Sequence, residues 1–185
     1  MARALRVPPL RETKQLELTV DGQQFRVVHD VGDGTGTPLL LMNGIGAKLE
    51  LLQPFVDLLS PQRDIIRFDV PGVGGSPTAR HPYRLKGLAR KVTGILKQLG
   101  FEKADVLGIS WGGGLAQQFA YSESAHCRKL VLVSTATGSI MVPAHPKILA
   151  KMITHRRYTD PDYLESVAHE IYGGTMRHNP TAALT

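Results

Sequence analysis

Cysteine is almost absent from this 185-residue chain, which has only Cys127. One cysteine forms neither a disulfide framework nor a cysteine-based metal site, and it is typical of a reducing compartment. The chain also lacks an apolar run long enough to span a membrane, and its first twenty residues lack the continuous apolar core of a signal peptide. These absences predict a soluble cytoplasmic protein without a membrane span.

Dense basic runs are missing as well, although the net charge is +6. The lysines and arginines are scattered and no aromatic residues are interleaved with them, so we expect no nucleic-acid partner. A basic surface that aids solubility explains the charge, and attraction to an anionic surface stays open as the alternative. Nothing in the composition indicates a metal or an organic cofactor, and 42% hydrophobic residues suffice for one sizeable core.

Short apolar runs alternate with helical periodicities from residue 38 onward. Before them, Asp21-Gly22 predicts a hairpin turn between two strands. The expected strands are 15–20, 23–29, 38–42, 64–70, 104–109 and 130–133, and the expected helices lie near 52–59, 85–99 and 112–121. This alternation predicts an α/β fold with a mostly parallel sheet and helices on both faces.

The pattern changes after Thr137, where two helices follow without a strand between them. The first is expected at about 146–156 and the second from Asp160-Pro161, a cap followed by proline. We interpret residues 139–185 as part of a helical lid, and residues 1–138 as the N-terminal part of the core. Asn179-Pro180 would begin another helix just before the chain stops, and 130–133 would be an exposed apolar edge. We therefore expect a truncated domain that lacks the last strands of its sheet.

The segment with the clearest chemistry contains Gly108-Ile109-Ser110-Trp111-Gly112. This G-x-S-x-G pattern is weak alone, but here an apolar strand precedes it and a helix follows at once. Such a turn holds the serine in a strained conformation above the carboxyl end of the sheet. Gly108 and Gly112 are expected to be needed because side chains there would collide across the turn. Ser110 is therefore the candidate nucleophile.

A second glycine-rich loop, Asn43-Gly44-Ile45-Gly46, follows the strand at 38–42. In hydrolases with this serine turn, one oxyanion donor is the backbone N–H after the nucleophile, here Trp111, and the other comes from this earlier loop. We assign the second donor to Ile45. Gly44 and Gly46 would let the backbone approach a substrate closely.

A third glycine-rich loop covers residues 71–76 and invites a phosphate-loop interpretation. Its spacing fails the G-x-G-x-x-G pattern, and Pro77 intervenes where a helix would have to start. We expect this loop to shape a turn, with Asp69 satisfying backbone groups of the loop; Asp69 as a catalytic acid is the alternative.

The chain resembles intracellular poly(3-hydroxyalkanoate) depolymerases of the medium-chain-length type, from about residue 38 to its end. The matching segments are 43–47, 68–76, 80–84 (Arg-His-Pro-Tyr-Arg), 108–113, 141–143 (Met-Val-Pro) and 171–174 (Ile-Tyr-Gly-Gly). The resemblance implies the α/β-hydrolase fold and hydrolysis of aliphatic hydroxyacid esters stored as cytoplasmic granules. Only the nucleophile role carries over, to Ser110. The hydrophobic polyester or the granule surface is the implied partner; the oligomeric state stays open.

The chain departs from the family in lacking an assignable acid and base. In this fold both follow the serine on later strands, and the resemblance places them beyond residue 185. Ser134 and Thr135 stand where some relatives carry an acid. The seven histidines are interpreted as surface or lid residues; they are His29, His81, His126, His145, His155, His169 and His178. We therefore expect the isolated chain to be nearly inert.

The main hypothesis is a serine ester hydrolase that acts through an acyl-enzyme at Ser110, with a lid that selects the acyl chain. The apolar lid residues in question are Ile140, Met141, Val142, Ile148, Leu149, Met152 and Ile153. For each of these residues taken singly, packing of the lid onto the core is the favoured explanation. The alternatives are a hydrolase of small esters or carbon–carbon bonds, and a non-catalytic truncated or granule-binding protein.

Overall fold

The computed structural model describes residues 12–136, 145–154, 156–173 and 178. The chain divides into two compact units, Met1–Ala136 and Thr137–Thr185, and each is described by itself. The first contains β1 (Thr13–Val20), β2 (Gln23–Asp30), β3 (Leu39–Met42), η1 (Leu49–Leu52), α1 (Gln53–Asp57), β4 (Ile65–Phe68), α2 (Leu85–Gln98), β5 (Ala104–Ile109), α3 (Trp111–Ser122), η2 (Ser124–His126) and β6 (Cys127–Val133). The second contains α4 (Pro146–Ile153), α5 (Arg156–Thr159) and α6 (Pro161–Ile171).

The strands of the first unit form one sheet in the order β1-β2-β4-β3-β5-β6. β1 and β2 pair antiparallel around Asp21 and Gly22, whose φ angles of 47° and 74° suit a tight hairpin turn. β2 is also antiparallel to β4, whereas β4, β3, β5 and β6 run parallel. The predicted mostly parallel sheet is confirmed, and every expected strand is present.

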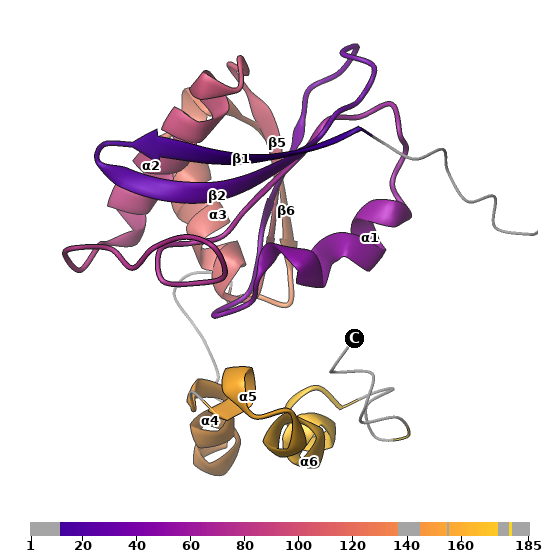
Figure 1. The fold of residues 1–185 in the computed structure, drawn as a ribbon, viewed down its shortest axis with the longest axis vertical. Coiled ribbons are helices and arrows are strands. Elements are labelled where there is room, and N and C mark those ends of the chain that lie inside the picture. The colour runs from indigo at the N-terminus through magenta and orange to yellow at the C-terminus, as the bar shows by residue number, and fades with distance from the viewer. Residues whose placement is uncertain (1–11, 137–144, 155, 174–177, 179–185) are drawn as a thin grey trace, which may run out of the picture. The chain divides into compact units, whose positions relative to one another are not determined.

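Helices cover both faces of this sheet (Figure 1). On one face, α2 and α3 pack on a core that includes Phe25, Leu40 and Val106. On the other face, Leu52 and Val56 of the η1–α1 segment pack against Leu39, Leu41 and Ile65. Burial on both faces explains why β3 and β4 are buried at every position.

β6 forms an edge of the sheet with an apolar sequence. Leu130, Val131, Leu132 and Val133 are each 38–46% exposed, although every one is paired in parallel register with β5. The predicted exposed apolar edge is therefore present in the part of the chain that the structure describes. The strand begins at Cys127, three residues earlier than the apolar run suggests.

In the second unit, α6 begins as predicted, because the Asp160 side chain accepts a hydrogen bond from the Tyr163 amide at 3.0 Å. The expected single helix over 146–156 is wrong: α4 ends at Ile153, and Thr154 is extended before the short α5. The spacing of the apolar residues does not predict this break, because no glycine or proline lies at it. The apolar residues 140–142 lie outside the described residues. None of the described helices has the length and apolar character needed to cross a bilayer.

Ion pairs gather at the amino ends of the parallel strands. Asp105, at the start of β5, is buried and accepts hydrogen bonds from Arg128 and Arg63. The Arg128 guanidinium, followed by that of Arg63, lowers the pKa of Asp105 from 3.8 to about 2. A carboxylate with a lowered pKa stabilises the folded state above its unfolded pKa and loses that effect as pH falls toward the folded value.

We predict that Asp105→Asn lowers the free energy of unfolding at pH 7 by about 1–2 kcal/mol. This value is smaller than the pKa shift alone would give, because solvent screens the partly exposed arginines. The difference from the unchanged chain should shrink between about pH 4 and pH 2, where Asp105 itself becomes protonated. Urea unfolding, followed by circular dichroism at several pH values, measures this difference in the free energy of unfolding. A difference that stays constant down to pH 2 would contradict the ion-pair explanation.

Candidate active site

Ser110 lies at the turn between β5 and α3 in a backbone conformation that side chains rarely adopt. Its φ is 54° and its ψ is −119°. Non-glycine residues at positive φ are uncommon and persist only when surrounding contacts impose them. The geometry expected of the serine turn is therefore present.

The glycines around Ser110 stand where a methyl group has no room. A Cβ on Gly108 would lie 2.4 Å from the Gly112 carbonyl oxygen and 2.7 Å from the Ala116 Cβ. This is the collision across the turn that the sequence predicts for Gly108. At Gly112 the reason differs from the prediction, because a Cβ there would meet the Met42 carbonyl oxygen, at 2.2 Å, at the end of β3.

Three hydrogen bonds fix the backbone of Ser110. Its N–H donates to the Val133 carbonyl at 2.9 Å, and its carbonyl accepts from the Gly113 N–H at 2.9 Å. The same carbonyl accepts from the Thr135 hydroxyl at 2.7 Å. Thr135 is a positioning residue that the sequence did not reveal as one, since its partner lies 25 positions earlier in the chain.

The loop after β3 lies beside Ser110. A Cβ placed on Gly44 would be in ordinary contact, at 3.8 Å, with the Ser110 Cβ. The Asn43 side chain shapes this loop: its Oδ1 accepts from the Gly44 N–H and its Nδ2 donates to the Lys48 carbonyl, both at 2.8 Å. The structure thus brings together the Gly44–Ile45 loop and Ser110, as the sequence predicts, with Ile45 half-exposed.

Trp111 is the first residue of α3. The first four N–H groups of a helix have no partner within the helix, and they concentrate partial positive charge at its start. The Trp111 amide therefore belongs to an end of a helix that favours a developing negative charge.

Asp69, the alternative acid, is fully buried and engaged in the third glycine-rich loop. Its Oδ1 accepts from the Leu49 N–H at 2.8 Å, and its Oδ2 accepts from the Gly75 N–H at 2.9 Å and from Arg26 at 3.2 Å. A Cβ on Gly74, where φ is 53°, would lie 2.1 Å from this carboxylate. The loop wraps around Asp69, and the predicted structural role is confirmed.

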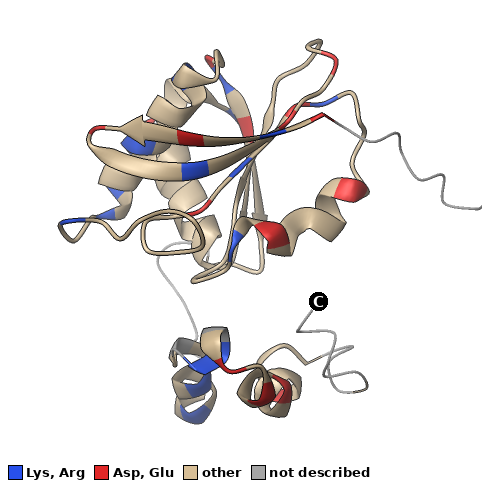
Figure 2. Cartoon of the chain, in the orientation of Figure 1, with Lys and Arg blue, Asp and Glu red and all other residues tan. Residues whose placement is uncertain are grey.

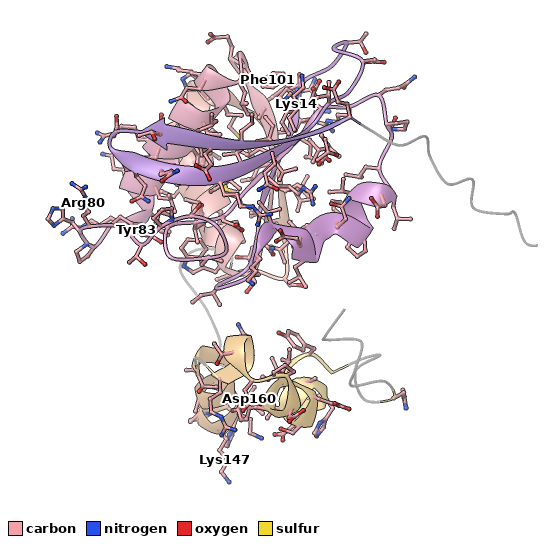
Figure 3. All side chains as sticks on the ribbon, viewed as in Figure 1. Lys14, Arg80, Tyr83, Phe101, Lys147 and Asp160 are labelled. Carbon is pink, nitrogen blue, oxygen red and sulfur yellow. The ribbon has the colours of Figure 1, made fainter. Side chains whose placement is uncertain are left out.

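Tyr83 lies on the loop that leads from the Asp69 region to α2 (Figure 3). Its hydroxyl donates to the Pro71 carbonyl at 3.4 Å, and burial raises the pKa of this hydroxyl. The contact ties the distal part of the loop back to its start.

The Ser110 hydroxyl has no hydrogen-bond partner among the described residues, and three of the described histidines are engaged elsewhere. His126 contacts the Glu102 carbonyl at 2.6 Å, and His145 caps α4. The interpretation of His29 as a surface residue is wrong: its ring is mostly buried, 2.7 Å from Asp64 and edge-on to Phe101. His155 lies outside the described residues.

We predict that Gly108→Ala destabilises the first unit by about 3 kcal/mol or more, because the added methyl group meets backbone that cannot move away. Gly114→Ala is the matched control, since its methyl group would meet only Leu85 at 4.0 Å, and alanine favours the helix by about 0.5–1 kcal/mol. Denaturant unfolding measures both variants, and equal stabilities would contradict this account of the turn.

Thr135→Val removes the hydrogen bond to the Ser110 carbonyl while keeping the shape of the side chain. We expect a loss of about 1 kcal/mol in the free energy of unfolding. Thr135→Ser, which retains the hydroxyl, should lose clearly less. If the valine variant unfolds at the same denaturant concentration as the original chain, Thr135 does not hold the turn.

Comparison with known proteins agrees with this geometry. A family model described as the alpha/beta hydrolase fold matches residues 37–170. The poly(3-hydroxyalkanoate) depolymerase of Ectopseudomonas oleovorans is 48% identical over 89% of this chain and 58% of its own length. The chain therefore spans under two thirds of this curated relative.

Solved structures show the same arrangement. The enol-lactonase from Burkholderia xenovorans LB400 superposes with a TM-score of 0.72 and 23% identity, over 91% of this chain and 65% of its own. A hydrolase from Pseudomonas aeruginosa PA01 gives a TM-score of 0.67 and 25% identity, over 92% and 66% of the two chains. The family match covers well over half of the sequence, and the serine turn, the sheet order and the flanking helices agree with it: the chain belongs to the α/β hydrolase fold family.

Proposed function

We propose that this chain carries the nucleophile and the oxyanion-binding amides of a serine ester hydrolase that cleaves poly(3-hydroxyalkanoate). The observation that carries the proposal is Ser110 at positive φ between β5 and α3, with the Gly44 loop against it. The substrate class rests on the 48% identity to a depolymerase of this polyester.

In the proposed reaction, the Ser110 Oγ attacks the carbonyl carbon of an ester. The amides of Trp111 and Ile45 stabilise the negative charge that develops on the carbonyl oxygen. The C–O bond then breaks, the hydroxyl end of the polymer leaves with a proton, and water hydrolyses the acyl-serine.

Attack by serine requires a base that accepts the hydroxyl proton. The Ser110 hydroxyl has no such partner among the described residues, and His29 and His126 are engaged elsewhere. We therefore propose that the acid and the base come from outside the residues that the structure describes, and that the 185-residue chain alone does not turn over.

The test is to expose the purified chain to the p-nitrophenyl ester of octanoic acid and to follow both p-nitrophenol release and the mass of the protein. We expect an octanoyl group to accumulate slowly on Ser110, because an oxyanion hole and substrate binding together retain about 10³–10⁴-fold acceleration over water when a triad member is missing. No steady release above the Ser110→Ala variant should follow.

Each other outcome contradicts one part of the proposal. Steady turnover that disappears in Ser110→Ala would show that the chain has its own base. Absence of an adduct at Ser110, with modification elsewhere or nowhere, would contradict the nucleophile role and favour a non-catalytic granule-binding protein. Faster acylation by the p-nitrophenyl ester of acetic acid would favour a hydrolase of small soluble esters.

A further inference from the structure

The loop that carries Ile45 is fixed at one peptide unit, the one between Lys48 and Leu49. The Lys48 carbonyl accepts a hydrogen bond from the side chain of Asn43, the residue that follows β3, at 2.8 Å. On the other side of the unit, the Leu49 N–H donates to the buried Asp69 carboxylate, also at 2.8 Å. Both polar groups of this peptide unit are therefore held by side chains.

Ile45 lies in a turn directly before the fixed unit. The Ala47 N–H donates to the Gly44 carbonyl at 3.2 Å, and the φ of 67° at Gly46 suits the third position of such a four-residue turn. Ile45 occupies the second position. Gly44, the first, is the residue whose added Cβ would lie 3.8 Å from the Ser110 Cβ. Because the turn ends next to the fixed unit, a shift of that unit would move the Ile45 amide relative to Ser110.

The Asp69 carboxylate is itself held in place from two further sides. Its second oxygen accepts from the Gly75 N–H at 2.9 Å and from Arg26 at 3.2 Å, and the residue is fully buried. Arg26 is the one lysine or arginine of β2, seen as the blue band on this strand in Figure 2. Hydrogen bonds to a carboxylate are stronger than those between neutral groups, and burial removes competing water. Asp69 thus offers the Leu49 N–H an acceptor in a defined position.

A second buried charge holds the carbonyl of Leu49. The Arg67 guanidinium donates to this carbonyl at 3.4 Å and to Asp30 at 2.8 Å. Arg67 lies two positions before Asp69, and residues two apart in an extended chain point to the same side. Burying charged groups costs free energy that apolar side chains would not cost. Two such groups directed at the backbone of one residue fit a segment whose position, and not only its burial, is specified.

We propose that Asp69 is a positioning residue for the oxyanion-binding loop. By holding the Leu49 N–H, it fixes the peptide unit after Lys48 and so places the Ile45 amide where negative charge develops on the ester carbonyl oxygen. The inference rests on the proposed function, because it gives Asp69 a part in the reaction at Ser110. It differs from the catalytic-acid alternative, since a fully buried carboxylate does not touch the substrate.

The test compares acylation of Ser110 in the 185-residue chain and in its Asp69→Asn variant. The p-nitrophenyl ester of octanoic acid is used at several concentrations, and the mass of the protein is followed. An asparagine keeps one acceptor oxygen and cannot accept from both Leu49 and Gly75. We expect the maximal acylation rate to fall about tenfold to a hundredfold, since a misplaced donor stabilises the transition state less. The ester concentration that gives the half-maximal rate should change less than about threefold, because Asp69 does not bind the ester.

Ser76→Ala is the matched control on the other side of Asp69. The buried Ser76 hydroxyl donates to the Asp69 carbonyl at 2.7 Å and accepts from the Arg26 N–H at 2.9 Å. Its loss loosens the same region and leaves the Leu49 N–H bonded, so urea unfolding should show a less stable chain whose acylation rate stays within about twofold of the original. Equal slowing by both variants, or acylation of Asp69→Asn at the original rate, would overturn the proposal.

Asn43→Ala carries the test if Asp69→Asn does not fold. Asn43 is only partly buried, and its loss releases the Lys48 carbonyl on the opposite side of the fixed unit. We expect acylation of Ser110 to slow about tenfold in a chain that still folds. Acylation at the original rate would show that the fixed unit does not place the Ile45 amide, and the role of Asp69 would be overturned with it.

Proton–nitrogen NMR of the same chains measures the position of the loop without any reaction. In Asp69→Asn, the Leu49 amide proton should exchange with solvent about tenfold faster or more, and the Ile45 resonance should shift, while Leu41 of β3 keeps its exchange rate. Unchanged Ile45 and Leu49 signals would overturn the proposal. If these signals change but the original chain forms no adduct at Ser110, the proposed function fails and the placement of the loop by Asp69 is supported.

Discussion

The close approach of α3 to the sheet is the constraint on which the candidate site depends. Gly108, Gly112 and Gly113 have no room for a methyl group, because the first turn of α3 lies against the ends of β3 and β5 and against Thr135. This approach brings together three segments that are far apart in the sequence: the Gly44 loop, the Ser110 turn and the residues that follow β6. A wider gap of even one methylene would separate them, since packed interiors do not absorb such volume without shifts.

The two ends of the parallel strands have different roles. At the amino ends, buried carboxylates meet arginine or histidine, as in the pairs of Asp105 with Arg128 and of Asp64 with His29. At the carboxyl ends lie the Gly44 loop and the Ser110 turn, which form the proposed site, whereas Asp69 is enclosed there by the third glycine-rich loop. In sheets of this kind, ligands bind outside the carboxyl ends of the strands. The division allows the amino end to contribute stability without restricting the residues at the other end.

Much of the fold and part of the site could be predicted from local sequence patterns. The strands, the hairpin at Asp21-Gly22 and the serine turn each depend on residues that are adjacent in the chain. The glycines of the turns also indicate directly which backbone conformation each turn needs. The break at Thr154, the partner of Thr135 and the burial of His29 could not be predicted, because each depends on tertiary packing that no local pattern records. Gly112 shows the intermediate case: the residue was identified, but the atom that excludes a side chain belongs to β3 and not to the turn.

The conformation of Ser110 has a consequence for the stability of the chain. Glycine adopts the backbone conformation of Ser110 without strain. Replacing Ser110 by glycine would therefore remove strain from the turn. If Ser110 is the nucleophile, as we propose, stability and chemistry favour different residues at position 110. Under the proposed function, the serine at this position costs stability that the chemistry requires, as is common at strained active-site positions.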